Sequence, residues 1–239
     1  MMGDPLPPPE RKVTYVRAMF ARIARRYDLM NRLMTLGRDR AWRRYTVARL
    51  EPVRPAVILD VATGTGDLAL EARRQHPQAH IVALDFVPEM LALARQKIVA
   101  RGVTVDLTAG DALQLPFPDA AFDGVVTGFA LRNVADIPAA FAEMARVTRS
   151  GGRIACLEIA KPRTPFFRQL FRLYFYRFVP LIGGLITGQR DAYTYLPHSL
   201  TAFLTPDEIV EVMRRAGWRQ VRYKRLMLGT VAVHTGVRE

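Results

Sequence analysis

Hydrophobic and polar positions alternate along the chain with two periods, one helical and one strand-like. Over 12–34 the apolar residues recur at spacings of three and four, as an amphipathic helix requires. They are Val16, Met19, Phe20, Ile23 and Tyr27. A second helix is predicted over 38–50, so the chain begins with a helical segment.

From residue 57 onward, short apolar runs alternate with helical patterns. The runs predict strands over 57–59, 81–84, 103–107, 122–127, 153–159, 218–225 and 227–235. The helical patterns cover 67–75, 88–101, 137–147 and a segment from a Thr205 cap to Gly217, and Gly151-Gly152 is predicted as a turn. Strands that alternate with helices of this length are typical of βαβ units. The predicted fold is α/β: a doubly wound, mainly parallel seven-stranded sheet with an N-terminal helical extension.

One domain over 12–239 is expected, with residues 1–11 as a disordered lead-in and 12–50 as the helical extension. Residues 163–203 interrupt the strand–helix rhythm with many aromatic side chains, among which Arg168, Arg172 and Arg177 are interspersed. They could form ordinary core, but burying unpaired arginine is costly. An amphipathic helix on an anionic membrane is the favoured interpretation. The uncharged stretch that follows Arg177 is too short to span a bilayer, so no transmembrane helix is predicted.

The net charge of +13 is unevenly distributed. Residues 1–50 and 161–239 carry +8 each, whereas 51–160 carry −3. Basic flanks attract nucleic acid or anionic lipid, and charge alone does not distinguish the two. The single cysteine, Cys156, excludes an internal disulfide and a cysteine zinc cluster and fits a reducing, cytoplasmic setting.

A glycine-containing loop follows the first strand of the predicted sheet. Gly64, Gly66 and Ala69 fit a dinucleotide-binding pattern, which by itself is a weak signal. Asp60 and Asp67 flank the loop, and carboxylates there repel a pyrophosphate but suit a cationic ligand. S-adenosylmethionine, which has a sulfonium and no phosphate, is such a ligand.

Acidic residues also end the next two strands. Asp85 lies 19 residues after Gly66, the offset of an acid that binds ribose hydroxyls. Phe86 follows and could cover an adenine, and Asp111 could accept from an amino group. As an alternative, each acid could be only a cap or turn residue. Because the strand ends meet at one edge of a parallel sheet, we favour a shared cofactor site.

The chain resembles class I S-adenosylmethionine-dependent methyltransferases, and within them the ubiquinone/menaquinone biosynthesis C-methyltransferase family. The resemblance covers about 12–238 and is carried by Tyr27–Asn31 with Thr35 and Trp42, Leu59–Leu68, Phe129–Val134 and Tyr195–Ser199. It implies cofactor contacts at four positions of this sequence. They are Thr65, Asp85, Asp111 and Ala112.

The sequence departs from the family pattern at four positions. Gly128 stands where serine is frequent, so only its backbone can contact the cofactor, and Ala130 often has glycine in its place. Asp39 replaces the usual histidine and Ser150 the usual proline. The departures remove no cofactor carboxylate but leave the substrate subtype open.

The resemblance implies methylation of a ring carbon of a reduced polyprenyl quinone. Such a carbon becomes nucleophilic when its neighbouring hydroxyl loses a proton, so the site needs a base or a cation beside the oxygen. Arg132 is the candidate for phenolate stabilisation, Asn133 for orienting an oxygen, Tyr27 for donating to the quinol and His198 for the base. The alternatives are a salt bridge for Arg132, core packing for Tyr27 and a surface loop for His198.

The expected substrate is demethylmenaquinol, with a benzoquinol as the alternative, and the aromatic segment is expected to hold the tail and contact an anionic membrane. A nucleic-acid methyltransferase is disfavoured because no RNA-binding motif is found. Another small-molecule methyltransferase or a non-catalytic cofactor-binding subunit are the remaining alternatives. No metal is expected, because His76, His80 and His234 have no partners at ligand spacing. Whether the protein forms a homodimer stays an open question at this point.

Overall fold

A computed structural model describes residues 11–51, 56–201 and 203–239, which share one seven-stranded sheet of order β3-β2-β1-β4-β5-β7-β6. Strand β7 is antiparallel to both of its neighbours, and all the other pairings are parallel. The α/β, mainly parallel fold is therefore confirmed, as a mixed sheet. The strands are β1 (Val57–Val61), β2 (His80–Asp85), β3 (Asp106–Ala109), β4 (Phe122–Gly128), β5 (Thr148–Ile159), β6 (Trp218–Leu226) and β7 (Val231–Arg238).

Most helices agree closely with the sequence pattern. Thr205 caps α9, and its hydroxyl and Glu208 form the expected capping box. The α-helices are α1 (Lys12–Met34), α2 (Asp39–Val47), α3 (Asp67–Gln75), α4 (Pro88–Ala100), α5 (Ile137–Val147), α6 (Pro165–Leu173), α7 (Val179–Thr187), α8 (Arg190–Thr201) and α9 (Pro206–Arg215). Two short 3-10 helices, η2 (Leu131–Asn133) and η4 (Met227–Gly229), and a π-helical turn, η3 (Tyr174–Phe178), complete the described elements.

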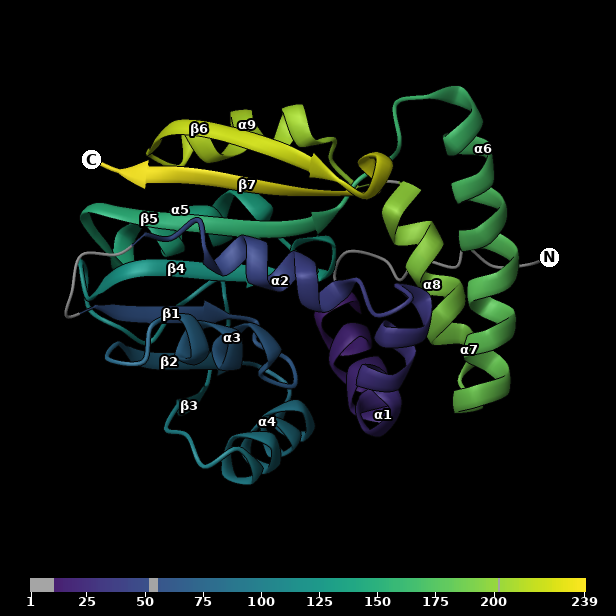
Figure 1. Ribbon diagram of the computed structural model, residues 1–239, viewed down its shortest axis with the longest axis horizontal. Helices are drawn as coiled ribbons and strands as arrows, with labels where there is room; N and C mark the ends of the chain where they lie inside the picture. Colours follow the sequence, from purple (N-terminus) through teal and green to yellow (C-terminus); the bar gives the residue numbers. More distant parts are fainter. Residues whose placement is uncertain (1–10, 52–55, 202) are drawn as a thin grey trace.

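Helices cover both faces of the sheet. Figure 1 shows α2 and α3 on the near face and α5 and α9 behind the strands. Trp218 and Phe141 are among the largest fully buried side chains, and they lie in the core on the α5–α9 side. The indole of Trp218 donates to the Phe141 carbonyl at 3.2 Å. The apolar faces of α3, α5 and α9 are thus buried against the sheet.

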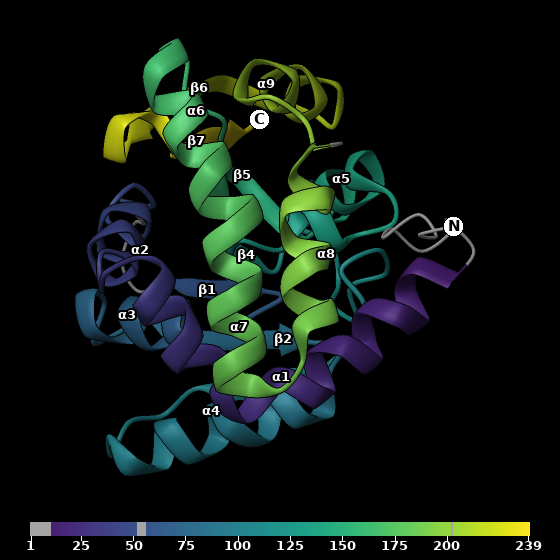
Figure 2. The same ribbon diagram turned by 90° about the vertical axis from the view of Figure 1, so that its right-hand side faces the viewer.

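A second group of helices lies beyond the carboxyl ends of the parallel strands. It consists of α1 and the α6–α8 segment, which Figure 2 shows in front of the sheet when it is viewed from that end. Segments far apart in the chain meet here: the Tyr174 hydroxyl donates to the Met34 carbonyl at 2.9 Å. These helices cover the edge of the sheet where the predicted site residues lie.

Three predicted boundaries in the sheet were wrong, and two of them concern β3 and β5. Strand β3 begins at Asp106 rather than at Val103, because only 106–109 pair with β2 while Val105 packs into the core. Strand β5 continues through Gly151 and Gly152, which were predicted as a turn. A register shift opposite Phe122 and Gly124 accommodates Gly151, whose φ is 79°. The chain therefore bulges without leaving the sheet.

The final hairpin also differs from the prediction. The last strand starts at Val231, not near 227, because Met227–Gly229 form a helical turn in which all three residues have positive φ. This turn projects the side chains of Met227 and Leu228 out of the sheet. Both remain substantially exposed to solvent.

The aromatic segment forms a longer helix than the sequence suggested. Helix α6, η3 and α7 run together over 165–187. By length and composition this 23-residue helix could cross a membrane, although such a single helix is weak evidence, and 22% of its most apolar window is buried. The prediction of no transmembrane helix rested on the uncharged stretch after Arg177, which is short. The helix itself is longer, because it begins at Pro165.

Candidate active site

The glycine loop after β1 lies close to α4. Gly64 and Gly66 both have positive φ, 57° and 84°. A Cβ added to Gly66 would lie 3.1 Å from the Cβ of Ala94, which is a tight contact, whereas one at Gly64 would meet nothing within 4 Å. Glycine at 66 therefore allows both the turn and the close approach of loop to helix.

Asp60 supports this loop from behind. Its carboxylate accepts hydrogen bonds from the Thr63 hydroxyl at 2.5 Å and the Ala69 N–H at 2.9 Å. The side chain is fully buried, and this burial raises the pKa of Asp60 to about 7. Asp60 thus orders the loop and the start of α3.

Asp85 ties the end of β2 to the same loop. Its Oδ2 accepts from the Gly64 N–H at 2.7 Å, and its Oδ1 accepts from the Val87 N–H at 2.9 Å. Burial raises the pKa of Asp85, while these backbone hydrogen bonds lower it. The carboxylate keeps acceptor capacity for a ligand, because two oxygens offer about four lone-pair sites.

A cavity of about 80 Å³, here called the acidic cavity, lies at these strand ends. It brings together six of the nine predicted cofactor residues: Gly64, Asp85, Phe86, Asp111, Ala112 and Gly128. Helix α1 supplies one wall through side chains that include Phe20 and Tyr27. None of the described residues that line it is lysine or arginine, so the cavity suits a neutral or cationic ligand.

The other three predicted cofactor residues lie outside the lining. Asp60 is behind the loop, Gly66 packs on α4, and the Thr65 hydroxyl donates to Asp28 at 2.6 Å and accepts from Lys97 at 2.9 Å. These three residues shape the loop in this structure.

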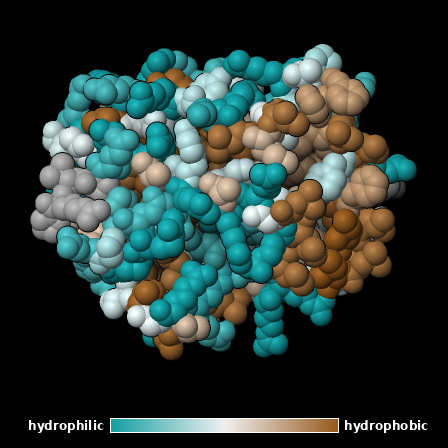
Figure 3. Space-filling model, in the orientation of Figure 1, coloured by the Kyte–Doolittle hydropathy of each residue, from teal (hydrophilic) through white to brown (hydrophobic). Residues whose placement is uncertain are grey.

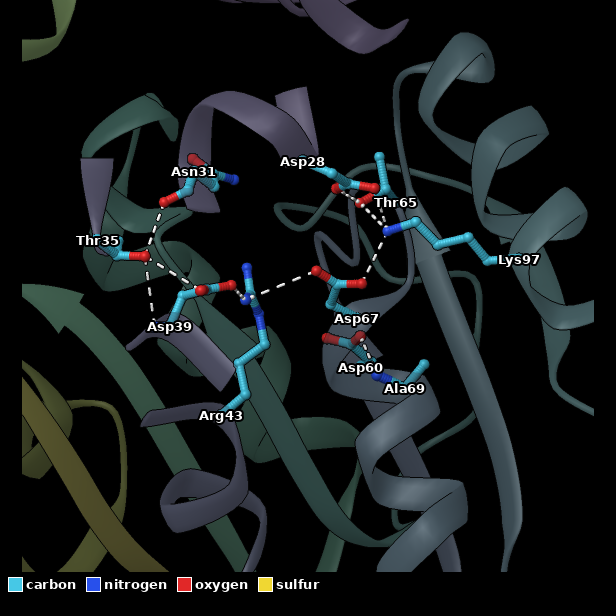
Figure 4. Close-up of polar contacts among 10 residues, drawn as sticks. All are labelled: Asp28, Asn31, Thr35, Asp39, Arg43, Asp60, Thr65, Asp67, Ala69 and Lys97. Carbon is cyan, nitrogen blue, oxygen red and sulfur yellow. Dashed lines mark hydrogen bonds and ion pairs between the residues drawn. The ribbon is translucent and has the colours of Figure 1, made fainter. Parts of the chain in front are cut away.

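Asp67 belongs to an ion-pair network that runs from α4 to α2 (Figure 4). Lys97 lies 2.7 Å from Asp67 and 2.5 Å from Asp28, and Arg43 lies 3.6 Å from Asp67 and contacts Asp39. Burial raises the pKa of Asp67, but the two cations outweigh this and lower it. The charge of Asp67, expected to attract a cationic ligand, is therefore engaged within the protein.

A larger cavity of about 450 Å³, the apolar cavity, adjoins the first. Its walls come from α1, α2, α6, η3 and η4 and are mainly aromatic and aliphatic. Tyr27 and Phe129 line both cavities, so the two meet there. A small group of polar or charged side chains also lines it: Tyr27, Asn31, Thr35, Asp39, Arg132, Tyr174 and Thr230.

Arg132 is held between the apolar cavity and the sheet. Its guanidinium donates to the Phe129 carbonyl at 2.7 Å and lies 3.7 Å from the carboxylate of Glu158. Glu158 is fully buried; burial raises its pKa, and the charge of Arg132 lowers it. The salt-bridge alternative for Arg132 is thus present, and the same side chain still lines the cavity.

Residues 9–238 match the ubiE/COQ5 methyltransferase family. The chain belongs to this family. The resemblance drawn from the four sequence segments is therefore confirmed.

Relatives of this methyltransferase match over nearly their whole length. The demethylmenaquinone methyltransferase of Roseiflexus castenholzii is 48% identical, covering 100% of this chain and 99% of the relative. The demethylmenaquinone methyltransferase of Deinococcus radiodurans is 48% identical, covering 92% of this chain and 91% of the relative. The ubiquinone/menaquinone biosynthesis C-methyltransferase UbiE of Desulfotalea psychrophila is 40% identical, covering 93% of this chain and 90% of the relative.

Solved structures agree at the level of the fold. The crystal structure of a Thermotoga maritima SAM-dependent methyltransferase, described as a possible histamine N-methyltransferase, matches with a TM-score of 0.66 at 18% identity. The match covers 94% of this chain and 100% of that one. At this identity the likeness shows a shared methyltransferase fold.

The methyltransferase places the remaining predicted catalytic residues differently. Asn133 lines the acidic cavity, and its buried Oδ1 has no hydrogen-bond donor among the described residues. Tyr27 lies where the cavities meet. His198 lies on α8, where its ring contacts Tyr176 with centroids 5.7 Å apart, and it lines neither cavity. His198 is therefore not brought together with the other three.

The structure adds residues that the sequence did not assign to the site. Asn31, Thr35 and Asp39 line the apolar cavity, and the amide nitrogen of Asn31 is buried without an acceptor in the described chain. Asn31 and Thr35 belonged to the segments that carried the family resemblance, which was the available signal. Among residues 11–51, 56–201 and 203–239, no group of three or more His, Cys, Asp or Glu is placed to hold a metal.

Proposed function

We propose that this methyltransferase transfers a methyl group from S-adenosylmethionine to a ring carbon of demethylmenaquinol, forming menaquinol. The relatives from Roseiflexus and Deinococcus carry the corresponding name. The observation that carries the proposal is the junction of the two cavities at Tyr27 and Phe129. One cavity suits a cationic cofactor, and the other suits an apolar substrate with a polar ring.

The acidic cavity fits the cofactor by the chemistry of its donors and acceptors. Asp85 is positioned to accept from ribose hydroxyls, and Phe86 and Met90 offer apolar surface for the adenine. Asp111, whose Oδ1 accepts from the Leu113 N–H at 2.9 Å, is positioned for the exocyclic amino group. When bound, S-adenosylmethionine supplies an electrophilic methyl group on a sulfonium.

The apolar cavity fits a prenylated ring. Its polar side, with Asn31 and Arg132, would receive the quinol oxygens, and its aromatic walls, with Phe167 and Phe171, would receive the tail. The protein's main contribution is to hold the ring carbon in line with the methyl group. Arg132 would stabilise negative charge that develops on the neighbouring oxygen.

A transfer assay distinguishes the quinone substrates. Purified protein with methyl-labelled S-adenosylmethionine is incubated anaerobically with demethylmenaquinol, with a demethylated benzoquinol and with the oxidised form of each, followed by mass analysis. We expect label on the reduced naphthoquinol and none on the oxidised quinones, because only the quinol has an electron-rich ring carbon. Preferred turnover of the benzoquinol, which the name of the UbiE relative includes beside menaquinone, would overturn the naphthoquinol assignment.

The apolar cavity opens near an exposed apolar surface, the tail-side patch. Figure 3 shows hydrophobic side chains gathered over the α6–α7 end of the molecule. The patch comprises Leu33, Leu36, Phe166, Leu170, Leu173, Tyr176, Phe178, Leu181, Leu185, Met227 and Leu228. Exposed Arg168, Arg172 and Arg177 are interspersed with it. We propose that it lies on an anionic membrane at the cytoplasmic face, where the quinol resides.

Vesicle binding tests the membrane contact. Replacing Leu173, Leu181 and Leu185 with Gln should weaken binding to phosphatidylcholine–phosphatidylglycerol vesicles, while turnover of a short-tailed quinol stays unchanged, because none of the three lines the apolar cavity. Added salt should weaken binding of the parent, since each arginine near the surface contributes about 1 kcal/mol. A parent protein that does not bind such vesicles even at low salt would exclude the membrane contact.

A further inference from the structure

Asp39 lies between two cavities of opposite character. It is 6% exposed, and it begins α2. On one side it lines the apolar cavity; on the other it lines a polar groove of about 930 Å³ whose walls include Arg40, Arg44 and Glu71. A proton on Asp39 therefore has a way out of the apolar cavity.

Asp39 is the single carboxylate among the described residues that line the apolar cavity. The same lining includes no histidine, and His198 is elsewhere. The Thr35 hydroxyl, 3.1 Å from Oδ1, and the guanidinium of Arg43 at Oδ2 fix the orientation of the carboxylate (Figure 4). A buried carboxylate held in one orientation is suited to proton transfer.

We propose that Asp39 accepts the proton of the quinol hydroxyl next to the methylated carbon and passes it to the polar groove. The inference rests on the proposed function and assigns the base that the reaction needs. It adds a catalytic residue to Arg132, which cannot accept a proton because its guanidinium is already protonated.

The step balances as follows. The ring carbon forms a bond to the methyl group, the carbon–sulfur bond breaks with its electron pair remaining on sulfur, and the hydroxyl proton moves to Asp39. The ring then holds a carbonyl and a methylated carbon that still bears hydrogen. After Asp39 releases its proton to the groove, that hydrogen moves as a proton to the carbonyl oxygen, which restores the aromatic quinol.

The acidity that the quinol hydroxyl gains during the transfer allows a carboxylate to accept its proton. As the ring carbon gives up electron density, the hydroxyl becomes that of a protonated carbonyl and is far more acidic than a phenol. Arg43 and Thr35 hold the two carboxylate oxygens in place. The other charged or titratable groups that face this region include Asp67 on α3, Tyr27 on α1 and Arg132 on η2. Arg40, Arg44 and Glu71 face it from the groove.

Replacement of Asp39 gives the direct test. Turnover of short-tailed demethylmenaquinol with S-adenosylmethionine is compared between the parent and the variant. Asp39→Asn keeps the size and one acceptor oxygen but cannot take a proton. We expect kcat to fall by about 10²–10⁴-fold, the usual contribution of a general base. Cofactor affinity should stay within about twofold, because Asp39 does not line the acidic cavity.

The pH dependence separates a base from a structural residue. For Asp39→Asn, kcat should rise about tenfold per pH unit in the alkaline range, because the quinol must ionise unaided, whereas the parent should stay nearly constant there. Asp39→His, which restores a proton acceptor, should recover activity with an acid limb near the imidazole pKa of about 6.5. Glu211→Gln is the control: it removes an exposed carboxylate on α9, outside both cavities and the groove, and should leave kcat unchanged.

Different results identify different failures. If the parent methylates the quinol and Asp39→Asn does so equally fast, the inference is wrong. It is also wrong if the loss in Asp39→Asn is the same at every pH, is not recovered by Asp39→His and accompanies a lower melting temperature. A folded parent that methylates no quinol would instead overturn the proposed function.

Discussion

The acidic cavity and the apolar cavity share a border but are built in different ways. Four strand ends form most of the acidic cavity, and the loop that follows each strand contributes its own residues. The apolar cavity is assembled from the ends of α1 and η4, the start of α2 and the inner face of α6 and η3, which lie far apart in the chain. Sequence at the strand ends thus supplies most of the first cavity, with one wall from α1, and helix packing determines the second.

Their polar groups differ accordingly. In the acidic cavity, Asp85 accepts from backbone N–H groups of its own loops. In the apolar cavity, Asp39 and Arg132 are each paired with a charged side chain, Arg43 and Glu158 respectively. Changes in the first cavity should therefore affect mainly ligand affinity, and changes in the second should affect stability and turnover together.

The largest effect is expected from Arg132→Ala. Removing the cation leaves Glu158 buried without its partner, which costs about 3–5 kcal/mol of unfolding free energy. Denaturant unfolding measures this, and the double variant Arg132→Ala, Glu158→Gln should recover a substantial part because no charge is left uncompensated. A loss below about 1 kcal/mol would show that the pair does not support the apolar cavity.

The pH dependence of stability should reveal Asp60. Its folded pKa of about 7 lies above the ordinary 3.8, so the folded protein holds a proton that the unfolded chain releases. The free energy of unfolding should therefore fall as pH rises from about 4 to about 7, by an amount on the order of 4 kcal/mol. Asp60→Asn should remove this slope.

The measurement is thermal unfolding of the parent and of Asp60→Asn at pH values from about 4 to about 7. His234, whose pKa burial lowers to about 4, contributes a slope of opposite sign, because the unfolded chain binds the proton there. It is present in both proteins, so the difference between them isolates Asp60. Identical pH profiles would contradict the prediction.

A smaller effect, mainly on affinity, is expected from Asp85→Ala. The variant loses charge-assisted hydrogen bonds to the cofactor worth about 1.5–3 kcal/mol each, which corresponds to at least a tenfold weaker S-adenosylmethionine affinity. Calorimetry measures the affinity, and Asp85→Asn, which keeps one acceptor, should lie between the variant and the parent. Unchanged affinity in a folded Asp85→Ala protein would remove Asp85 from the site.

The smallest effects come from the two loop glycines, which form a matched pair. Gly64→Ala should cost about 1–2 kcal/mol, because its positive φ is strained for alanine but its surroundings are open. Gly66→Ala should cost about 1 kcal/mol more, since the added methyl group also meets Ala94. Equal melting temperatures for the two variants would show that the loop does not pack tightly on α4.

The sequence by itself determined the features that depend on near neighbours. The bounds of α1, α3 and α5 follow from apolar spacing, and the start of α9 follows from the cap at Thr205. The gathering of Asp85 and Asp111 follows from the rule that parallel strands end at one edge. Each depends on interactions within a few residues or on a general property of α/β sheets.

Only the tertiary structure decided the rest. The start of β3 at Asp106 depends on which residues of β2 it pairs with, and the position of His198 away from the cavities depends on how α8 packs. The sequence marked Asp39 only as a departure from the family pattern, whereas helix packing places it between an apolar cavity and a polar groove. Contacts between distant segments carry no local pattern, because they arise only when separate elements bury their apolar faces against one another.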